Sequence, residues 1–354
     1  MTPTADIAAP AILALDAHGL SHRFGDVVAV DGVDLAIPVG AIFGLLGPDG
    51  AGKSTLIRML ATVLPPDSGD AAIFGESVMH APRRVTPRIG YMSQQFSMYP
   101  DLTVSENLEF FATIRAVPAS LRAERAASLL ESMGLTEFAG RQAQHLSGGM
   151  KQKLMLASTL MHEPDLLLLD EPTTGVDPVS RREFWRIIAG LRRAGKTVLV
   201  ATPYMDEAER CTHIAFMEGG RIQHRGTPAE VKALVPGRLY EVAADNPRAA
   251  LVVAEKLPGI ASAHLFGEVV RVLATPGGPD EVALAAAMRD GGVASAVVRP
   301  ASIDMEAVFA YLAEGVGDVV VVDAGAAGST GAGAGSGAVV AGATDGTRAG
   351  GERS

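Results

Sequence analysis

The stretch Gly47-Pro48-Asp49-Gly50-Ala51-Gly52-Lys53-Ser54-Thr55 decides the fold of this chain. Its glycines have no side chains, so the backbone can wrap closely around a phosphate chain with its N–H groups pointing inward. Lys53 is placed to reach the β- and γ-phosphates of a nucleotide, and Ser54 offers a hydroxyl to Mg²⁺. The stretch therefore predicts a phosphate-binding loop for a nucleoside triphosphate, and all nine residues are candidates for nucleotide contacts.

The sequence around this loop has the expected context. A phosphate-binding loop needs a strand before it and a helix after it, so that the helix N-terminus faces the anion. Residues 41–46 read Ala-Ile-Phe-Gly-Leu-Leu, a short apolar run that suits a buried parallel strand. Leu56, Ile57, Leu60 and Ala61 follow at helical spacing. We therefore expect a strand, the loop and a helix in direct succession.

The composition narrows the range of partners. The chain has 354 residues, enough for two domains, and a formal net charge of −10. An acidic balance argues against general affinity for nucleic acid, so no nucleic-acid partner is expected. Cys211 is the only cysteine, which rules out an intramolecular disulfide and a C-x-x-C metal site and indicates a reducing compartment.

The chain carries no sequence pattern for entering a membrane. Its N-terminus lacks a basic region followed by an apolar core, so we do not expect a secretory signal. No apolar stretch approaches the roughly 20 residues that cross a bilayer. We expect a polypeptide that is soluble by itself, so that any work at a membrane requires another chain to supply the span.

Residues 1–226 are predicted to form one α/β domain. Apolar strand candidates alternate with helical patterns, which implies a largely parallel sheet covered by helices. The stretch from about 96 to 161 contains helices and no good strand, and predicts an inserted helical subdomain. The strand candidates are 33–37, 41–46, 71–74, 89–92, 166–169 and 198–201, and the helices 53–63, 105–115, 120–133, 149–161 and 180–194.

Residues 227–315 are predicted to form a second, smaller domain. The pattern is strand (239–243), helix (247–256), strand (261–265), strand (268–273), helix (279–289), strand (294–299), helix (302–313). This order predicts a small α+β domain of the split-βαβ type. Residues 316–354 consist mainly of Gly, Ala, Ser and Thr and cannot bury enough apolar area to offset their ordering entropy. They are expected to be a disordered tail without a catalytic role.

A second motif lies at the end of the predicted strand 166–169. Asp170 and Glu171 follow four leucines directly. Asp170 is placed to hold Mg²⁺, directly or through water, and Glu171 to polarise an attacking water. An acidic turn after a core strand is the alternative interpretation, and the phosphate-binding loop upstream favours the catalytic one.

The segment Leu146-Ser147-Gly148-Gly149-Met150-Lys151-Gln152 resembles the signature sequence of ABC-type ATPases. Ser147 opens a predicted helix, whose N-terminal N–H groups form a second anion site. The resemblance implies that this helix faces the γ-phosphate of ATP held by another subunit, so that ATP is sandwiched between two copies. It also implies the fold class: a P-loop NTPase of ABC type, with a mainly parallel sheet core, an antiparallel β subdomain and an inserted helical subdomain.

Further family positions match residue by residue. Phe24 resembles the aromatic residue that stacks on adenine. Gln94 resembles the glutamine that touches Mg²⁺ and joins the sheet to the helical subdomain, although Gln95 leaves this register ambiguous. Asp177, in Gly175-Val176-Asp177-Pro178, resembles a loop residue at the dimer seam. The implied catalytic residues are Lys53, Gln94 and Glu171, and the implied Mg²⁺ ligands are Ser54, Gln94 and Asp170.

One position departs from the family pattern. Pro203 stands where the family has a histidine that contacts the γ-phosphate, and the nearest histidine after it, His213, comes ten residues later. Proline has neither a side-chain donor nor a backbone N–H. Hydrolysis at a reduced rate through Glu171 is one expectation. The other is an ATP-dependent dimerisation switch with little hydrolysis.

The segment from Phe96 to Leu108 resembles the part of bacterial multidrug-type exporter ATPases that receives a helix of the membrane subunit. The resemblance implies an ATP-hydrolysing ABC exporter subunit for drugs or other small hydrophobic compounds. Its implied partners are a second ATPase subunit, identical or a paralogue, and an integral membrane permease at the cytoplasmic face of the cell membrane. A cytosolic nucleic-acid- or ribosome-linked ABC ATPase is the alternative. It is disfavoured because the chain has one phosphate-binding loop and no long coiled coil between Lys53 and Ser147.

Overall fold

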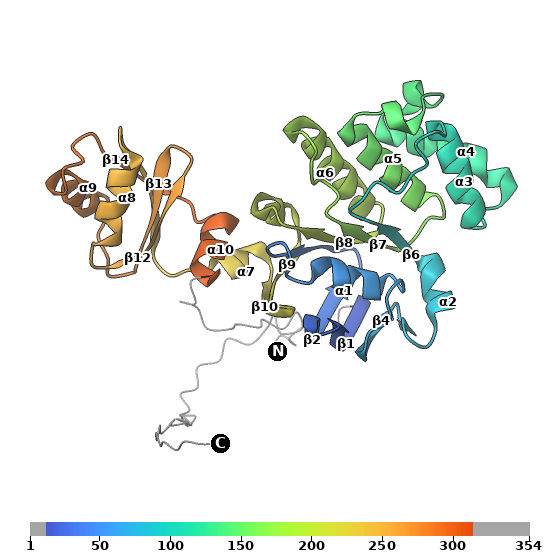
Figure 1. Ribbon diagram of the computed structural model, residues 1–354, viewed down its shortest axis with the longest axis horizontal. Coiled ribbons are helices and arrows are strands. Elements are labelled where there is room, and N and C mark those ends of the chain that lie inside the picture. Colours follow the sequence, from blue (N-terminus) through green and yellow to red (C-terminus); the bar gives the residue numbers. More distant parts are fainter. Residues whose placement is uncertain (1–11, 314–354) are drawn as a thin grey trace, which may run out of the picture.

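The computed structural model describes residues 12–313, which form three β-sheets with helices packed on them (Figure 1). The central sheet has six strands in the order β10-β9-β3-β8-β7-β6. All neighbouring pairs in it are parallel except β9 with β10. Its strands are β3 (Ile42–Leu46), β6 (Ile89–Met92), β7 (Leu166–Asp170), β8 (Thr197–Thr202), β9 (His213–Glu218) and β10 (Arg221–Gly226).

The four leucines of β7 show why the central strands are continuously apolar. Leu166 and Leu168 pack into a core shared with α1 (Lys53–Leu60). Leu167 and Leu169 point to the other face, into a core shared with α5 (Gly148–Leu160) and α6 (Pro178–Arg193). Both faces of the sheet are therefore covered, which is the arrangement that such uninterrupted apolar runs predict.

The second sheet is antiparallel and packs on the same side as α1. Its order is β2-β1-β4-β5, with β1 (Leu13–Phe24), β2 (Val27–Pro38), β4 (Ser68–Ile73) and β5 (Glu76–Ser77). It confirms the antiparallel β subdomain of the predicted fold class. Strand β1 was not among the strand candidates, because register shifts between Ala17 and His22 break its alternation of apolar and polar residues.

Between β6 and β7 the described chain is helical. The helices α3 (Val104–Ile114) and α4 (Ala119–Met133) pack against each other and against α5. Thr103 caps α3, with its hydroxyl accepting from the Glu106 N–H and the Glu106 carboxylate accepting from the Thr103 N–H, so this helix begins where a Ser/Thr N-cap is expected.

Short helices occupy Pro82–Val85 (α2) and Pro228–Lys232 (α7). Of the helices between residues 12 and 313, none is long and apolar enough to cross a membrane.

The third sheet and its two helices, here called the C-terminal sheet unit, span residues 238–301. This unit has the predicted strand-helix-strand-strand-helix-strand order and packs both helices against one core. A last helix, α10 (Met305–Ala313), lies beside α7 between this unit and the central sheet (Figure 1). The predicted tail lies outside the described residues. The strands of this sheet lie in the order β12-β13-β11-β14. Along the chain, the unit consists of β11 (Arg238–Ala243), α8 (Pro247–Glu255), β12 (Ile260–Phe266), β13 (Val269–Ala274), α9 (Glu281–Asp290) and β14 (Val297–Ala301).

Candidate active site

The predicted phosphate-binding loop joins the end of β3 to the start of α1. Two of its glycines are required by close packing and by backbone conformation. A Cβ on Gly47 (φ 154°) would lie 2.1 Å from the carbonyl oxygen of Met217, and one on Gly52 (φ 101°) would lie 2.1 Å from that of Ala29. Any larger residue at these positions would push the loop away from its neighbouring strands.

Lys53 places a buried cation inside this loop. Its Nζ donates hydrogen bonds of 2.8 Å to the carbonyl oxygens of both Gly47 and Pro48. Burial lowers the pKa of the ammonium group, while the carboxylates of Glu171, Asp49 and Asp170 oppose that shift. The loop thus holds a partly desolvated positive charge where the phosphates of a nucleotide would meet it.

Ser54 and Asp170 form a candidate cation site. The Ser54 hydroxyl donates to Asp170 Oδ1 at 2.8 Å, and Asp170 Oδ2 is buried without a hydrogen-bond partner. Burial is also the main cause that raises the pKa of the Asp170 carboxyl group. A hydroxyl and a carboxylate with an unused oxygen fit Mg²⁺. No cluster of three or more His, Cys, Asp or Glu residues that could hold a metal occurs between residues 12 and 313. Mg²⁺ commonly completes its coordination with substrate phosphates and water.

Glu171 is held in an unusual backbone conformation beside this site. Its φ is +48°, in the left-handed region that non-glycine residues seldom adopt, and such strain is typical of functional positions. The buried carboxylate accepts hydrogen bonds at Oε2 from Gln94 Nε2 (2.9 Å) and from Thr174 Oγ1 (3.1 Å). Of the two adjacent glutamines, Gln94 is the one that contacts Glu171, which favours the register that the sequence left ambiguous.

The remaining predicted site residues lie at two helix starts and at one strand end. Ser147 caps α5, accepting from the Met150 N–H at 3.3 Å, and α5 covers the sheet face opposite α1. Gly148 and Gly149 form the first turn of the same helix. Asp177 caps α6, and its carboxylate accepts from the N–H groups of Val179 and Ser180. The Ser180 side chain, and after it these N–H groups, lower the pKa of the Asp177 carboxyl group. Phe24 ends β1 with half of its surface exposed.

Pro203 directly follows β8. His213, the next histidine in the sequence, does not take the place of a histidine at this position. His213 is the first residue of β9 and pairs with Phe43 near the start of β3. The phosphate-binding loop follows the opposite end of β3. The ten-residue separation in sequence thus corresponds to opposite ends of the central sheet.

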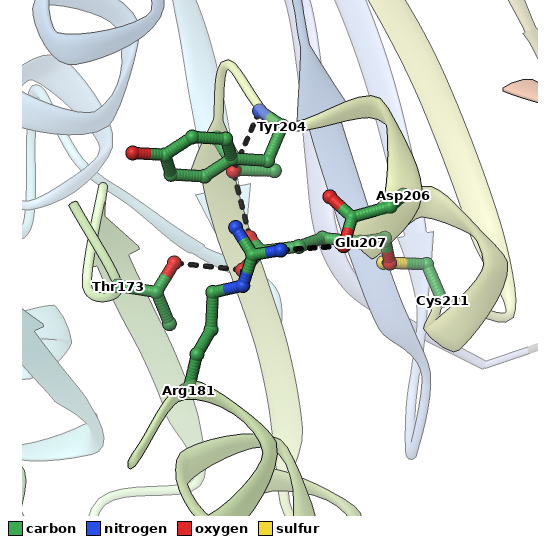
Figure 2. A network of polar contacts seen from close by, with 7 residues as sticks. Thr173, Arg181, Tyr204, Asp206, Glu207 and Cys211 are labelled. Carbon is green, nitrogen blue, oxygen red and sulfur yellow. Dashed lines mark hydrogen bonds and ion pairs between the residues drawn. The ribbon is translucent and has the colours of Figure 1, made fainter. Parts of the chain in front are cut away.

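Sequence reasoning missed one set of polar residues near the site. Glu207 is completely buried, and its carboxylate accepts hydrogen bonds of 2.7 Å from the hydroxyls of Thr173 and Thr202 (Figure 2). Thr173 lies in the turn after β7, whereas Thr202 is the last residue of β8, so no local spacing in the sequence marks the whole group.

A phosphate-binding loop after a central parallel strand, with an acidic pair at the end of another strand, defines the class of P-loop nucleoside triphosphatases. Comparison narrows the class: residues 30–174 match the family model described as ABC transporter. The chain is 43% identical over 270 residues to the probable multidrug ABC transporter ATP-binding protein YbhF of Escherichia coli, covering 75% of this chain and 47% of that protein. It is also 43% identical over 221 residues to the daunorubicin/doxorubicin resistance ATP-binding protein DrrA of Streptomyces peucetius, covering 62% and 67%. The chain belongs to the family of ABC transporter ATP-binding proteins, and it spans about half the length of the E. coli relative.

Solved structures are similar to about three fifths of the chain. A dimeric ATP-binding cassette, described as a post-hydrolysis state bound to ADP and Pi, has a TM-score of 0.55 at 26% identity and covers 60% of this chain and 98% of that one. CbiO1 from Clostridium perfringens, described as part of an ABC transporter complex, has a TM-score of 0.58 at 27% identity, with coverage of 63% and 91%. These similarities confirm the predicted ABC-type fold.

Proposed function

We propose that this chain is the ATP-binding and ATP-hydrolysing subunit of an ABC exporter. The observation that carries the proposal is the cluster of Lys53, Ser54, Gln94, Asp170 and Glu171. It places a buried cation, a hydroxyl–carboxylate pair and a hydrogen-bonded glutamate around one phosphate-binding loop. These are the parts that phosphoryl transfer to water requires.

The proposed mechanism assigns one task to each group. Lys53 and the loop N–H groups would bind the β- and γ-phosphates, and Ser54, Asp170 and Gln94 would hold Mg²⁺. When bound, Mg²⁺ neutralises charge on the phosphates. Glu171 accepts the proton of the attacking water, while Gln94 and Thr174 fix the orientation of its carboxylate.

The second half of the nucleotide site is proposed to come from another copy or a paralogue. Ser147, Gly148 and Gly149 open a 13-residue helix whose N-terminus favours an anion. They lie at the start of a helix on the sheet face opposite α1, so they are available to the γ-phosphate bound by a partner. Phe24 would stack on the adenine, and Asp177 would lie at the seam. The dimeric description of a similar cassette supports this arrangement.

We further propose that the chain works with a separate membrane permease at the cytoplasmic face of the membrane. Tyr99 is 47% exposed and its ring meets that of Phe110 edge-on at 4.5 Å, which gives the helical segment an aromatic surface for such a partner. Relatives are named for multidrug transport, daunorubicin/doxorubicin resistance and, in Ralstonia nicotianae, Nod factor export. These names support export of drugs or other small hydrophobic compounds. In this proposal residues 1–226 are the ATPase domain, with a helical subdomain at 96–161, and residues 227–315 an accessory domain.

Replacement of Glu171 by Gln tests the proposal. The amide keeps the shape of the side chain but cannot accept the proton, so ATP turnover should fall about 10²- to 10⁴-fold. ATP binding should persist, and size-exclusion chromatography should show an ATP-dependent dimer of the variant. Undiminished turnover in Glu171→Gln would refute the assignment of the base.

Pro203 favours a second candidate, an ATP-dependent dimerisation switch. The same experiment separates the two functions. Wild-type turnover no faster than that of Glu171→Gln, together with an ATP-dependent dimer of both, would support the switch.

A further inference from the structure

The carboxylate of Glu207 contacts side chains from three segments: the turn after β7, the end of β8 and helix α6 (Figure 2). Thr173, two residues after Glu171, donates to Oε1, and Thr202, the last residue of β8, donates to Oε2. Arg181, in α6, approaches Oε1 with its Nε at 3.8 Å. A fully buried carboxylate is unfavourable unless such groups satisfy it, so this contact set holds all three segments together.

The hydrogen bond between Glu207 and Thr202 stabilises the loop that contains Pro203. The Thr202 hydroxyl donates to Glu207 and also accepts from the N–H of Tyr204 at 3.1 Å. Both neighbours of the proline are thus fixed by hydrogen bonds. The Arg181 guanidinium lies over the Tyr204 ring at 4.8 Å and donates to Asp206 at 2.6 Å, which pins the far side of the loop to α6.

The contact set also reaches the turn that carries Glu171. This turn is short: the N–H of Thr174 donates to the carbonyl of Glu171, and that of Val176 donates to the carbonyl of Thr173. The Thr174 hydroxyl in turn donates to the Glu171 carboxylate. A displacement of Thr173 would therefore move the group that orients Glu171.

We propose that Glu207 is a positioning residue for ATP hydrolysis, acting through the Thr173 hydroxyl to hold the Glu171 turn against the Pro203 loop. This inference rests on the proposed role of Glu171 as the base. Pro203 offers no donor to the reaction, so the loop at this position contributes through its fixed geometry. In this proposal, Glu207 fixes the geometry of the loop through its hydrogen bonds and makes no contact with the nucleotide.

Thr173→Val and Thr173→Ser form the decisive pair. Valine keeps the shape of threonine and removes the hydroxyl, whereas serine keeps the hydroxyl and removes a methyl group. Loss of one hydrogen bond to a charged group should lower kcat for ATP about tenfold in Thr173→Val. The KM for ATP should change less than about twofold, because the phosphate-binding loop is untouched. Thr173→Ser should retain most of the wild-type kcat.

Thr159→Val is the matched control. The Thr159 hydroxyl bonds only within its own helix, to the carbonyl of Met155 at 2.8 Å, and it lies outside the proposed site. Its removal should leave both kcat and KM unchanged. A double-mutant cycle adds a second test: with Glu207→Gln already present, Thr173→Val should lower kcat much less than it does alone, because the two residues act as one unit.

Several results would overturn the inference. The first is a kcat for ATP in Thr173→Val equal to that of the wild type. Another is equal loss in the valine and serine variants with a raised KM, which would indicate packing. Additive effects in the cycle would also contradict it. If Thr173→Val folds too poorly to be assayed, a wild-type kcat in Glu207→Gln would contradict the inference instead. If Glu171→Gln abolishes turnover and Thr173→Val does not, only the positioning role fails. If Glu171→Gln retains turnover, the proposed base fails, and the inference that depends on it fails too.

Discussion

At the scale of single residues, Asp170 is a proposed Mg²⁺ ligand whose buried carboxylate destabilises the folded chain at neutral pH. Its carboxyl group is completely buried, and only Oδ1 has a hydrogen-bond partner. A carboxyl group with a raised pKa binds its proton more tightly in the folded chain than in the unfolded one. It therefore favours folding below its unfolded pKa of about 3.9, and this stabilisation is lost as the pH rises through the folded-state pKa.

Asp170→Asn should consequently separate stability from activity. The neutral amide removes the buried charge, so the nucleotide-free variant should melt at a higher temperature than the wild type at pH 7, with a smaller difference at pH 4. Turnover of MgATP should fall roughly 100-fold, the size typical of removing one electrostatic group from an active site. Thermal denaturation at the two pH values and an ATPase assay check both parts. A lower melting temperature at pH 7 would contradict the argument.

Pro203 supplies a second prediction at this scale. In Pro203→His, an imidazole donor would become available beside the γ-phosphate, and kcat should rise by up to about tenfold. Pro203→Ala is the control, because it removes the ring constraint without adding a donor. An ATPase assay of the three proteins decides: equal kcat in all of them would show that this position does not limit the rate.

At the scale of elements, the two glycines that open α5 face different surroundings. A Cβ on Gly149 would lie 2.5 Å from the Ser180 side chain in α6, whereas one on Gly148 would meet only the carbonyl oxygen of Gly175 at 3.6 Å. Gly149 therefore sets how closely α5 approaches α6. Gly148 has room for a methyl group.

Alanine at each of these glycines should have opposite effects on the nucleotide-free chain. Gly149→Ala should lower the melting temperature because α5 and α6 must separate. Gly148→Ala should leave it unchanged or raise it slightly, since alanine favours a helix over glycine by up to about 1 kcal/mol. Adding Ser180→Gly to Gly149→Ala should restore part of the loss. Equal melting temperatures for both single variants would show that the helices are not in tight contact.

Elements with a regular apolar pattern could be predicted from sequence, and the exceptions have physical causes. The buried strands β6, β7 and β8 lie where their apolar runs predicted them, because both faces are covered. Strand β1 was not predicted because bulges interrupt its alternation of apolar and polar residues. Lys53, Ser54, Asp170 and Glu171 belong to local motifs, so spacing alone was enough to predict them as site residues. Glu207 was missed because its partner Thr173 lies 34 residues away, and only the folded sheet brings them together.

At the scale of the whole molecule, α10 ties the C-terminal sheet unit to the central sheet. Met305 and Val308 of this helix are buried in the same hydrophobic cluster as Phe216 of β9 and Leu239 of β11. Phe309 stacks on Phe216 with ring centroids 6.1 Å apart. The helix also contacts the 3₁₀ turn Met205–Arg210, which contains Glu207. The end of the described chain is thereby packed close to the loop that follows Pro203.

Two methionines can show whether this packing couples the parts energetically. Met305 joins the cluster shared with β9, whereas Met288 is buried in a cluster confined to the C-terminal sheet unit. Replacement of either by alanine should cost about 2–5 kcal/mol locally, because both are almost fully buried. Met305→Ala should speed amide hydrogen exchange in β9 as well as in α10. Met288→Ala should speed it only within the C-terminal sheet unit. If β9 exchanges at the same rate in both variants and the wild type, α10 is merely in contact with the central sheet and contributes nothing to its stability.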